Sequence, residues 1–150
     1  MSVFPSRPVR LLLVISGVLL AGYWLTLLVM THLPPDFLYS HFTATGEYLE
    51  QGGDKPLHLL AYSGLAFLFT SWLWFRGVEE PRLWKLTAVV LCSYAVFDEL
   101  SQIPFRRTAD VADCLADWAG IALGSLCFLA ARMILDRFSN RRNATSFEAR

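Results

Sequence analysis

Two groups of polar, mostly ionisable residues border apolar stretches of the sequence and have the chemistry of a binding or proton-transfer site. The first group is Asp54, Lys55 and His58, in which Asp54 and His58 are one helical turn apart. The second group consists of Asp98, Glu99, Gln102, Arg106, Arg107, Asp110, Asp113 and Asp117. Carboxylates and imidazoles can exchange protons, and lysine and arginine can hold a phosphate or carboxylate. These residue types therefore predict a site that handles protons or binds an anionic ligand.

The composition places these groups in a membrane protein. Hydrophobic residues make up 55% of the 150 positions, including eleven Phe and five Trp, which is too apolar for a soluble domain of this size. Four apolar segments are each long enough, at about 1.5 Å per residue, to cross a hydrocarbon core of roughly 30 Å. They are Leu11–Met30, Pro56–Phe75, Leu83–Ile103 and Val111–Leu135. The sequence thus predicts an all-α integral membrane four-helix bundle.

Charge patterning predicts the domain boundaries and the orientation. Residues 1–10 are expected to be a cytoplasmic segment, 11–135 the four-helix domain with an uncleaved first helix, and 136–150 a polar, frayed tail. With the N-terminus in the cytoplasm, ten of the thirteen Lys and Arg residues lie on the cytoplasmic side, leaving Lys55, Arg106 and Arg107 outside. We therefore expect a multi-pass protein of the cytoplasmic (inner) membrane, with both termini cytoplasmic and the polar groups facing outward.

The ionisable residues should meet inside the bundle. A charged side chain at mid-bilayer costs on the order of 2.5–3.5 kcal/mol, so unpaired carboxylates facing lipid are disfavoured. Helical spacing forms a polar stripe on each of the last two segments: Tyr94, Asp98 and Gln102 with Glu99 beside them, and Asp113 and Asp117 followed by Gly120 and Gly124. Because glycines let a neighbouring helix approach closely, we expect the acids to be enclosed between helices at one depth.

The same residues permit other interpretations. The N-termini of the second and fourth helices, together with Lys55 and the two arginines, favour an anion such as a phosphate. The acids near those helix starts could instead act as caps, leaving Arg106 or Arg107 to pair with Glu99. These acids are Asp54, Asp110 and Asp113. The polar network could therefore be a ligand site or a structural network that fixes the helix register.

The sequence predicts neither a metal nor a cofactor. One histidine and several carboxylates could form a mixed nitrogen and oxygen site, but no HExxH or Cys/His spacing indicates one. His58 is either a hydrogen-bonded interfacial residue or a general base. A net charge of zero and the lack of a basic block exclude a nucleic-acid partner. Nothing in the sequence indicates the oligomeric state.

Taken together, these motifs resemble the VanZ-like family, small membrane proteins named for a teicoplanin-resistance protein. The family pattern has Asp-Lys and His at the start of one span, Asp-Glu and Gln near the end of the next, and Arg, Asp and Gly leading into the last. The matching residues are Asp54, Lys55, His58, Asp98, Glu99, Gln102, Arg107, Asp113, Gly120 and Gly124. The family often has Asn at the position of Asp117. The resemblance implies a fold and a membrane location, and it defines no chemical mechanism.

Three functions fit these residues. The leading hypothesis is an outward-facing polar pocket that binds a lipid-linked or amphiphilic cell-envelope molecule, with Lys55 and Arg107 at its anionic group. By analogy with the family's named member, its role would be glycopeptide (teicoplanin) resistance. The residues expected to bind the ligand are Asp54, Lys55, His58, Asp98, Glu99, Gln102, Arg107, Asp113 and Asp117.

The other two hypotheses come from different classes of protein. The second is a membrane enzyme that hydrolyses or transfers a lipid phosphate, with His58, Asp98 and Glu99 as candidate catalytic residues and Arg107 stabilising the transferred charge. The third is a membrane scaffold in which the polar network only holds the helices together. Product formation by the purified protein would distinguish the enzyme hypothesis from the binding hypothesis.

Overall fold

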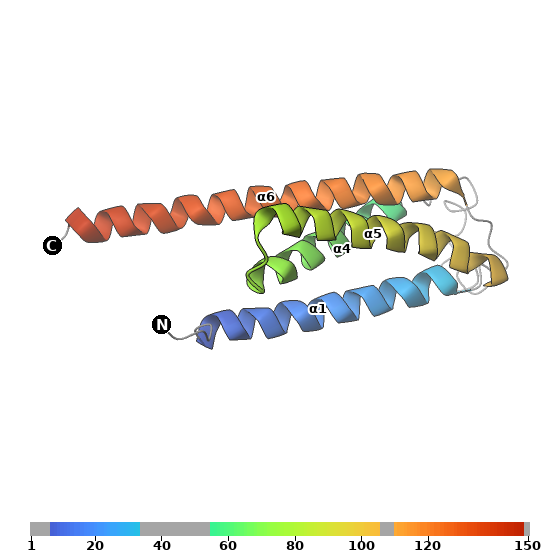
Figure 1. Cartoon of the computed structure of the whole chain (residues 1–150), viewed down its shortest axis with the longest axis horizontal. Helices are drawn as coiled ribbons and strands as arrows, with labels where there is room; N and C mark the ends of the chain where they lie inside the picture. The colour runs from blue at the N-terminus through green and yellow to red at the C-terminus, as the bar shows by residue number, and fades with distance from the viewer. Residues whose placement is uncertain (1–6, 34–54, 106–109, 149–150) are drawn as a thin grey trace, which may run out of the picture.

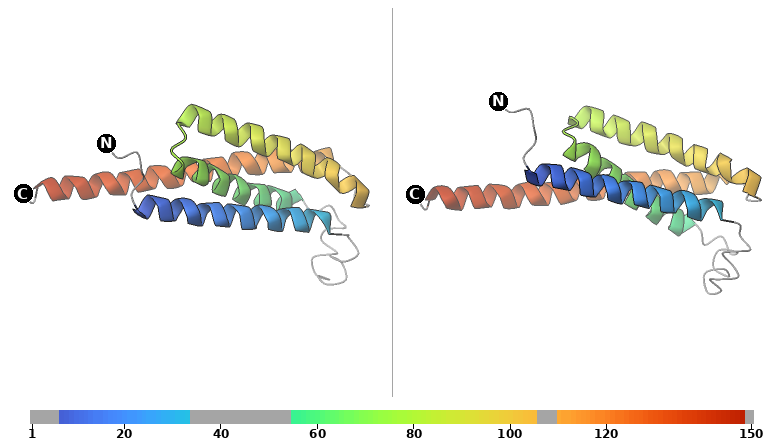
Figure 2. Two further views of the ribbon diagram at one scale, coloured as in Figure 1. Left: turned by 60° about the horizontal axis from the view of Figure 1, so that its bottom comes forward. Right: turned by 90° about the horizontal axis from the view of Figure 1, so that it is seen from below.

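A computed structural model describes residues 7–33, 55–105 and 110–148. Within these ranges helices are the only regular secondary structure, which confirms the predicted all-α class. The helices are α1 (Arg7–His32), α4 (Lys55–Phe75), α5 (Glu80–Gln102), the short 3-10 helix η1 (Ile103–Phe105) and α6 (Val111–Glu148). The four long helices lie side by side and alternate in direction (Figures 1 and 2). The end of α1 and the start of α4 therefore lie at the same end of the bundle as the end of α5 and the start of α6.

Proline and glycine determine where these helices begin and end. Pro56 and Pro81 lie in the first turns of α4 and α5, where a missing N–H costs no intrahelical hydrogen bond. The turn between α4 and α5 contains Gly77 with a φ of 75°, a left-handed conformation that glycine adopts without a steric penalty. As predicted, α5 stops near Pro104, where the chain continues as η1.

Three of the four long helices are long and apolar enough to cross a membrane by composition alone: Arg10–His32, Lys55–Phe75 and Val111–Phe138. The predicted span Leu83–Ile103 forms most of α5 but is not among them, because α5 carries charged residues at both ends. α6 is longer than expected and continues past Leu135 to Glu148. No proline or glycine follows Leu135 to end the helix.

α4 packs against each of the other long helices and most extensively against α6. The contact depends on glycine, as the stripe on the last segment predicted. A Cβ atom added to Gly120 would collide with the backbone of Leu59, and one added to Gly124 would collide with the backbone carbonyl of Ser63. The two helices therefore meet backbone to backbone, which is possible only because these residues lack side chains.

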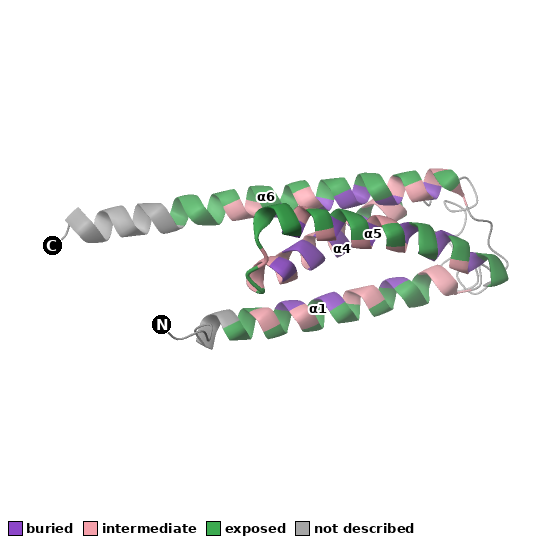
Figure 3. Cartoon of the chain, viewed as in Figure 1, coloured by how far each residue is buried: buried purple, intermediate pink, exposed green. Residues whose placement is uncertain are grey.

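Buried apolar side chains line the faces that the helices turn toward one another, while large apolar residues cover the outer faces (Figure 3). Leu65, Leu83 and Leu91 are fully buried, and Tyr23 of α1 lies against Gly64 and donates a hydrogen bond to the Ala61 carbonyl at 2.8 Å. Exposed residues such as Val14 and Leu126 would face lipid.

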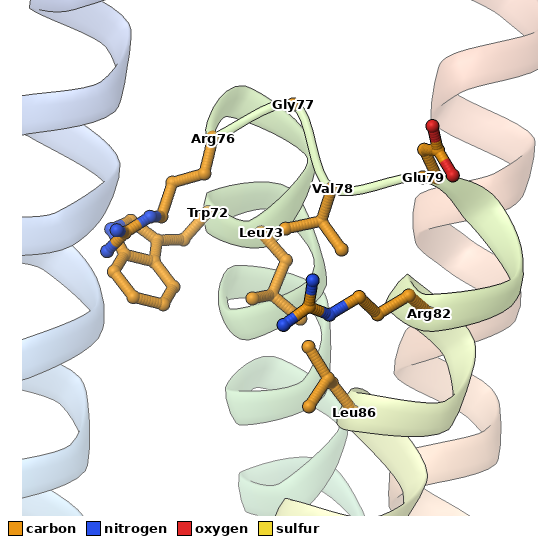
Figure 4. Close-up of a pocket in the computed structure, with 8 residues that line it drawn as sticks. All are labelled: Trp72, Leu73, Arg76, Gly77, Val78, Glu79, Arg82 and Leu86. Atoms are coloured by element: carbon orange, nitrogen blue, oxygen red, sulfur yellow. The ribbon is translucent and has the colours of Figure 1, made fainter.

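A pocket of about 590 Å³ lies at the α4–α5 turn (Figure 4). It is lined by Trp72, Leu73, Arg76, Gly77, Val78, Glu79, Arg82 and Leu86. The guanidinium of Arg76 lies 4.7 Å from the centre of the Trp72 ring, a cation–π arrangement. Nearby, Arg132 of α6 pairs with Glu80 of α5. This end of the bundle carries the cationic side chains of Arg76, Arg82 and Arg132.

Candidate functional site

Polar side chains from all four long helices meet at the end of the bundle opposite the α4–α5 turn. Asp98 and Asp117 are fully buried there, and Gln102, Glu99 and Asp113 are only 3%, 5% and 7% exposed. We call this group the polar cluster. Its members are Thr31, His32, Lys55, His58, Tyr62, Asp98, Glu99, Ser101, Gln102, Asp110, Asp113 and Asp117. All the predicted site residues within the described ranges belong to it, whereas Asp54, Arg106 and Arg107 lie outside those ranges.

Asp98 joins three helices through its two carboxylate oxygens. The Thr31 hydroxyl of α1 donates to Oδ1 at 3.0 Å, and the Tyr62 hydroxyl of α4 donates to Oδ2 at 3.2 Å. A fully buried carboxylate needs such donors, because a buried charge without partners is strongly destabilising. Tyr62 lies one helical turn after His58 in α4, and the contribution of α1 was not predicted.

The last turn of α1 contributes a second contact that the sequence did not reveal. Nε2 of His32 lies 2.9 Å from the Ser101 hydroxyl, which itself donates to the backbone carbonyl of Asp98 at 2.8 Å. Nδ1 of His32 lies 2.8 Å from the Leu28 carbonyl. The only signal in the sequence is that Thr31 and His32 are polar and end the first apolar segment on the predicted outer side.

His58 of α4 and Asp117 of α6 form the central pair of the cluster. Nδ1 of His58 lies 2.9 Å from Oδ1 of Asp117, and the imidazole is only 11% exposed. Because an ionised carboxylate can only accept hydrogen bonds, the ring proton lies on Nδ1, and a neutral ring then has its lone pair on Nε2. The pair fixes both the tautomer and the orientation of the imidazole, so that Nε2 can accept a proton or bind a metal.

Asp110 caps α6 and connects it to α5. Its Oδ1 accepts the Ala112 N–H at 2.8 Å, and its own N–H donates to Oε2 of Glu99 at 3.0 Å. The hydrogen bond from Ala112, with a further contribution from Lys55, lowers the pKa of Asp110. The capping role that the sequence allowed for Asp110 is therefore confirmed, and Glu99 is held by the backbone at this cap.

Lys55 lies at the partly exposed edge of the cluster, with 41% of its side chain accessible. Its Nζ lies 3.2 Å from Oδ1 of Asp113 and 3.4 Å from Oδ2 of Asp110. The contact with Asp113 is an ion pair without hydrogen-bond geometry. Lys55 is thus placed where it can contact both the buried acids and a group that approaches from outside.

The cluster holds more negative than positive charge among its described residues. Four buried carboxyl groups, those of Asp98, Glu99, Asp113 and Asp117, are balanced by Lys55 and by whatever charge the histidines carry. Ligand atoms of Glu99 and Asp113 lie within 4.8 Å of each other, and two carboxylates at that distance repel by roughly 3–4 kcal/mol at an effective dielectric constant of about 20. The arrangement therefore favours a bound cation or protons shared between carboxyl groups.

Several buried polar atoms in the cluster have no hydrogen-bond partner within the described part of the chain. They are Oε1 of Glu99, Nε2 of Gln102, Oδ1 of Asp113 and Oδ2 of Asp117. Buried polar atoms in folded proteins are nearly always satisfied, so a concentration of exceptions at one place calls for a physical explanation. The cluster can act as a proton acceptor at His58, a cation site between the carboxylates, or a binding site for a polar headgroup next to Lys55.

The family comparison agrees with the resemblance of the motifs. No curated protein and no solved structure matches the chain. The VanZ/LLP1 family model matches residues 18–134, from within α1 to within α6, and so includes the described residues of the polar cluster. Because this match extends over most of the sequence, the chain belongs to the VanZ/LLP1 family.

Proposed function

We propose that the polar cluster binds a lipid-linked or amphiphilic cell-envelope molecule on the outer side of the cytoplasmic membrane. One observation supports this most strongly: the cluster is buried between four helices, yet several of its polar atoms have no hydrogen-bond partner among the described residues. A scaffold network would be expected to satisfy its own polar atoms, because each unsatisfied buried group costs about 1–3 kcal/mol. The unsatisfied atoms favour a ligand over a purely structural role.

In this proposal α5 crosses the membrane together with the other three helices. Asp98 and Glu99 are buried within the bundle, whereas the accessible side chains nearby, such as Val96, Phe97 and Leu100, are apolar. The charges that lower the hydropathy of α5 therefore do not face lipid at this end. Such a helix is stable in a membrane when its polar side chains pair with neighbouring helices.

The charge distribution supports the proposed orientation. Cationic side chains gather at the end that holds the α4–α5 turn, where Arg76 and Arg82 line the pocket and Arg132 pairs with Glu80. Because cytoplasmic loops carry an excess of Lys and Arg, that end is assigned to the cytoplasm and the polar cluster to the outer side. Lys55 would contact the anionic headgroup there, with Arg107 as the proposed second contact.

Lipid binding by the purified protein tests this proposal. The protein in detergent is mixed in turn with polyprenyl phosphate, phosphatidylglycerol and phosphatidylcholine, and bound lipid is measured by native mass spectrometry. We expect selective binding of an anionic lipid. Lys55→Gln should weaken it about tenfold or more, which corresponds to the loss of one charge-assisted contact.

The matched control is Lys85→Gln, since Lys85 is exposed on α5 near the opposite end of the bundle. This variant should bind lipid like the wild type. Equal binding of phosphatidylcholine and the anionic lipids by the wild-type protein would contradict the proposal, as would equal effects of the two lysine substitutions. Glycopeptide resistance is a separate readout: expression in a teicoplanin-sensitive host should raise the inhibitory concentration if the analogy with the family's named member holds.

A second function, hydrolysis or transfer of a lipid phosphate, is favoured by the pair formed by His58 and Asp117. A carboxylate that orients an imidazole is the arrangement of a general base, and Glu99 lies close enough to serve the same purpose. Release of phosphate from polyprenyl phosphate or pyrophosphate by the wild type, and its loss in His58→Gln, would establish the enzyme. Lipid binding without release of phosphate would exclude the enzyme and support only the binding function.

A further inference from the structure

We infer that His58, Glu99 and Asp113 bind a divalent transition-metal ion. The three residues come from α4, α5 and α6, and each offers one ligand atom within 4.8 Å of the other two. Zinc is held about 2.0–2.2 Å from nitrogen and oxygen ligands in tetrahedral geometry, so two ligand atoms on one ion are about 3.3–3.6 Å apart. Side-chain rotations that shift the ligand atoms by about 1 Å would therefore bring all three onto one ion. The inference deepens the proposed function and rests on the same polar cluster.

The hydrogen bond between His58 and Asp117 prepares the imidazole for a metal. Nδ1 donates to the buried carboxylate at 2.9 Å, which leaves the lone pair on Nε2 available to an ion. Histidines that bind metals nearly always donate their other ring N–H to a carboxylate, a carbonyl or water, which fixes the ring and strengthens the ligand. Asp117 is fully buried and occupies this supporting position.

Glu99 provides the second, independent indication of a ligand. Its Oε2 accepts the Asp110 N–H at 3.0 Å, whereas its Oε1 is buried and has no hydrogen-bond partner among the described residues. The residue as a whole is only 5% exposed. A metal ion would satisfy this oxygen, and the fixed second oxygen would keep the carboxylate aimed at the site.

Asp113 is the third proposed ligand, and its ion pair with Lys55 places that lysine next to the metal site. Nζ of Lys55 lies 3.2 Å from Oδ1 of Asp113 at the partly exposed edge of the cluster. Its charge competes with that of an incoming ion, and its long side chain can turn toward solvent when the ion binds. The ammonium would then lie beside the open coordination positions, where an anionic headgroup or a water molecule can bind the metal.

The ligand types indicate which ions the site prefers. One imidazole nitrogen with two carboxylates suits Zn²⁺ or Mn²⁺, whereas Ca²⁺ takes six to eight oxygen ligands. Three protein ligands also leave at least one coordination position open, as in catalytic rather than structural zinc sites. A bound dication would offset the excess of negative charge among the described residues of the cluster.

Direct metal titration tests the inference. Wild-type protein with a non-histidine tag is treated with EDTA, exchanged into chelator-free detergent buffer, and titrated separately with Zn²⁺, Mn²⁺ and Ca²⁺ by calorimetry. We expect one saturable site for Zn²⁺ or Mn²⁺, a higher unfolding temperature in its presence, and binding of Ca²⁺ that is at least about tenfold weaker. Absence of saturable binding by the wild type overturns the inference without recourse to any variant.

Variants locate the site. Glu99→Gln and His58→Asn should abolish saturable binding, and Asp117→Asn should weaken it about 10–100-fold by releasing the imidazole. Glu79→Gln is the matched control, because Glu79 is exposed at the α4–α5 turn, at the opposite end of the bundle, and it should bind metal like the wild type. Equal metal affinity in Glu99→Gln and Glu79→Gln would overturn the assignment.

The metal inference and the proposed function can fail separately. Polyprenyl phosphate binding is measured on the same EDTA-treated protein with and without added Zn²⁺ or Mn²⁺. Selective lipid binding without any metal site refutes the metal inference and leaves the proposed function standing. A metal site without selective lipid binding refutes the proposed function and leaves the metal inference standing. Metal-dependent lipid binding supports both.

Discussion

The hydroxyl of Thr31 lies 3.0 Å from Oδ1 of Asp98, although 67 positions separate the two residues in the sequence. The last turn of α1 is thereby joined to a fully buried carboxylate near the end of α5. The hydroxyl of Tyr62 donates to the second oxygen of the same carboxylate. α1 is therefore part of the polar cluster as well as of the apolar packing, and its loss would expose a fully buried acid of the site.

Replacement of Thr31 by Val should destabilise the protein because it removes one donor to buried Asp98. We expect a cost of about 1–3 kcal/mol in the free energy of unfolding, measured by denaturant titration in mixed micelles. The matched control is Thr26→Val in the same helix, where the hydroxyl bonds only to the Gly22 carbonyl one turn away. That variant should lie within about 0.5 kcal/mol of the wild type. Equal costs for the two would show that the bond to Asp98 contributes nothing specific.

Replacement of Gly124 by Ala should separate α4 from α6. The new Cβ would collide with the Ser63 carbonyl, and such overpacking costs about 1–3 kcal/mol in unfolding free energy. Gly22→Ala provides the control, since nothing lies within 4 Å of a Cβ at that position. Because alanine favours helix by up to about 1 kcal/mol, Gly22→Ala should be neutral or stabilising. A stable Gly124→Ala variant would contradict the backbone-to-backbone contact.

The cap formed by Asp110 should make part of the stability depend on pH. Because the pKa of Asp110 is lowered in the folded protein, the ionised group stabilises the fold above its unfolded pKa of about 3.9. That contribution is lost as the pH falls through the lowered folded value. Asp110→Ala should therefore be less stable than the wild type between pH 5 and 8, roughly the range in which the cap is fully ionised. The difference should shrink below about pH 4, and a difference that is constant down to about pH 2 would contradict the assignment.

Cysteine labelling tests the proposed orientation. In a background in which Cys92, Cys114 and Cys127 are replaced by Ser, single cysteines are introduced as Val111→Cys and Glu79→Cys, at the exposed start of α6 and at the α4–α5 turn. A membrane-impermeant maleimide applied to intact spheroplasts should label the first variant, and should label the second only after permeabilisation. The reverse pattern would place the polar cluster on the cytoplasmic side.

The sequence predicted the parts of the fold that depend on regular spacing. Asp113, Asp117, Gly120 and Gly124 recur at intervals of three or four positions, so a helix must place them on one face, and α6 does so. The energetic cost of charges in lipid then required the acids to turn inward. The buried positions of Asp98 and Asp117 follow from these two arguments.

Other features depend on contacts that spacing does not encode. Thr31 and His32 are isolated polar residues at the end of an apolar segment, and only the tertiary arrangement shows that they meet Asp98 and Ser101. The pairing of His58 with Asp117, rather than with Glu99, likewise depends on the rotation of α4 against α6. Composition alone does not identify α5 as a membrane span, because its charged residues lower its mean hydropathy. Two of those residues, Asp98 and Glu99, are nevertheless buried within the bundle.

The glycine contacts between α4 and α6 also determine the geometry of the acid–base pair. Leu59, whose backbone meets Gly120, directly follows His58, and Asp117 lies one helical turn before Gly120. A slip of one residue along α4 would displace the imidazole by about 1.5 Å and rotate it by roughly 100° around the helix axis, away from its carboxylate. Mutations among these apolar neighbours should therefore impair proton or metal chemistry without altering any ionisable residue.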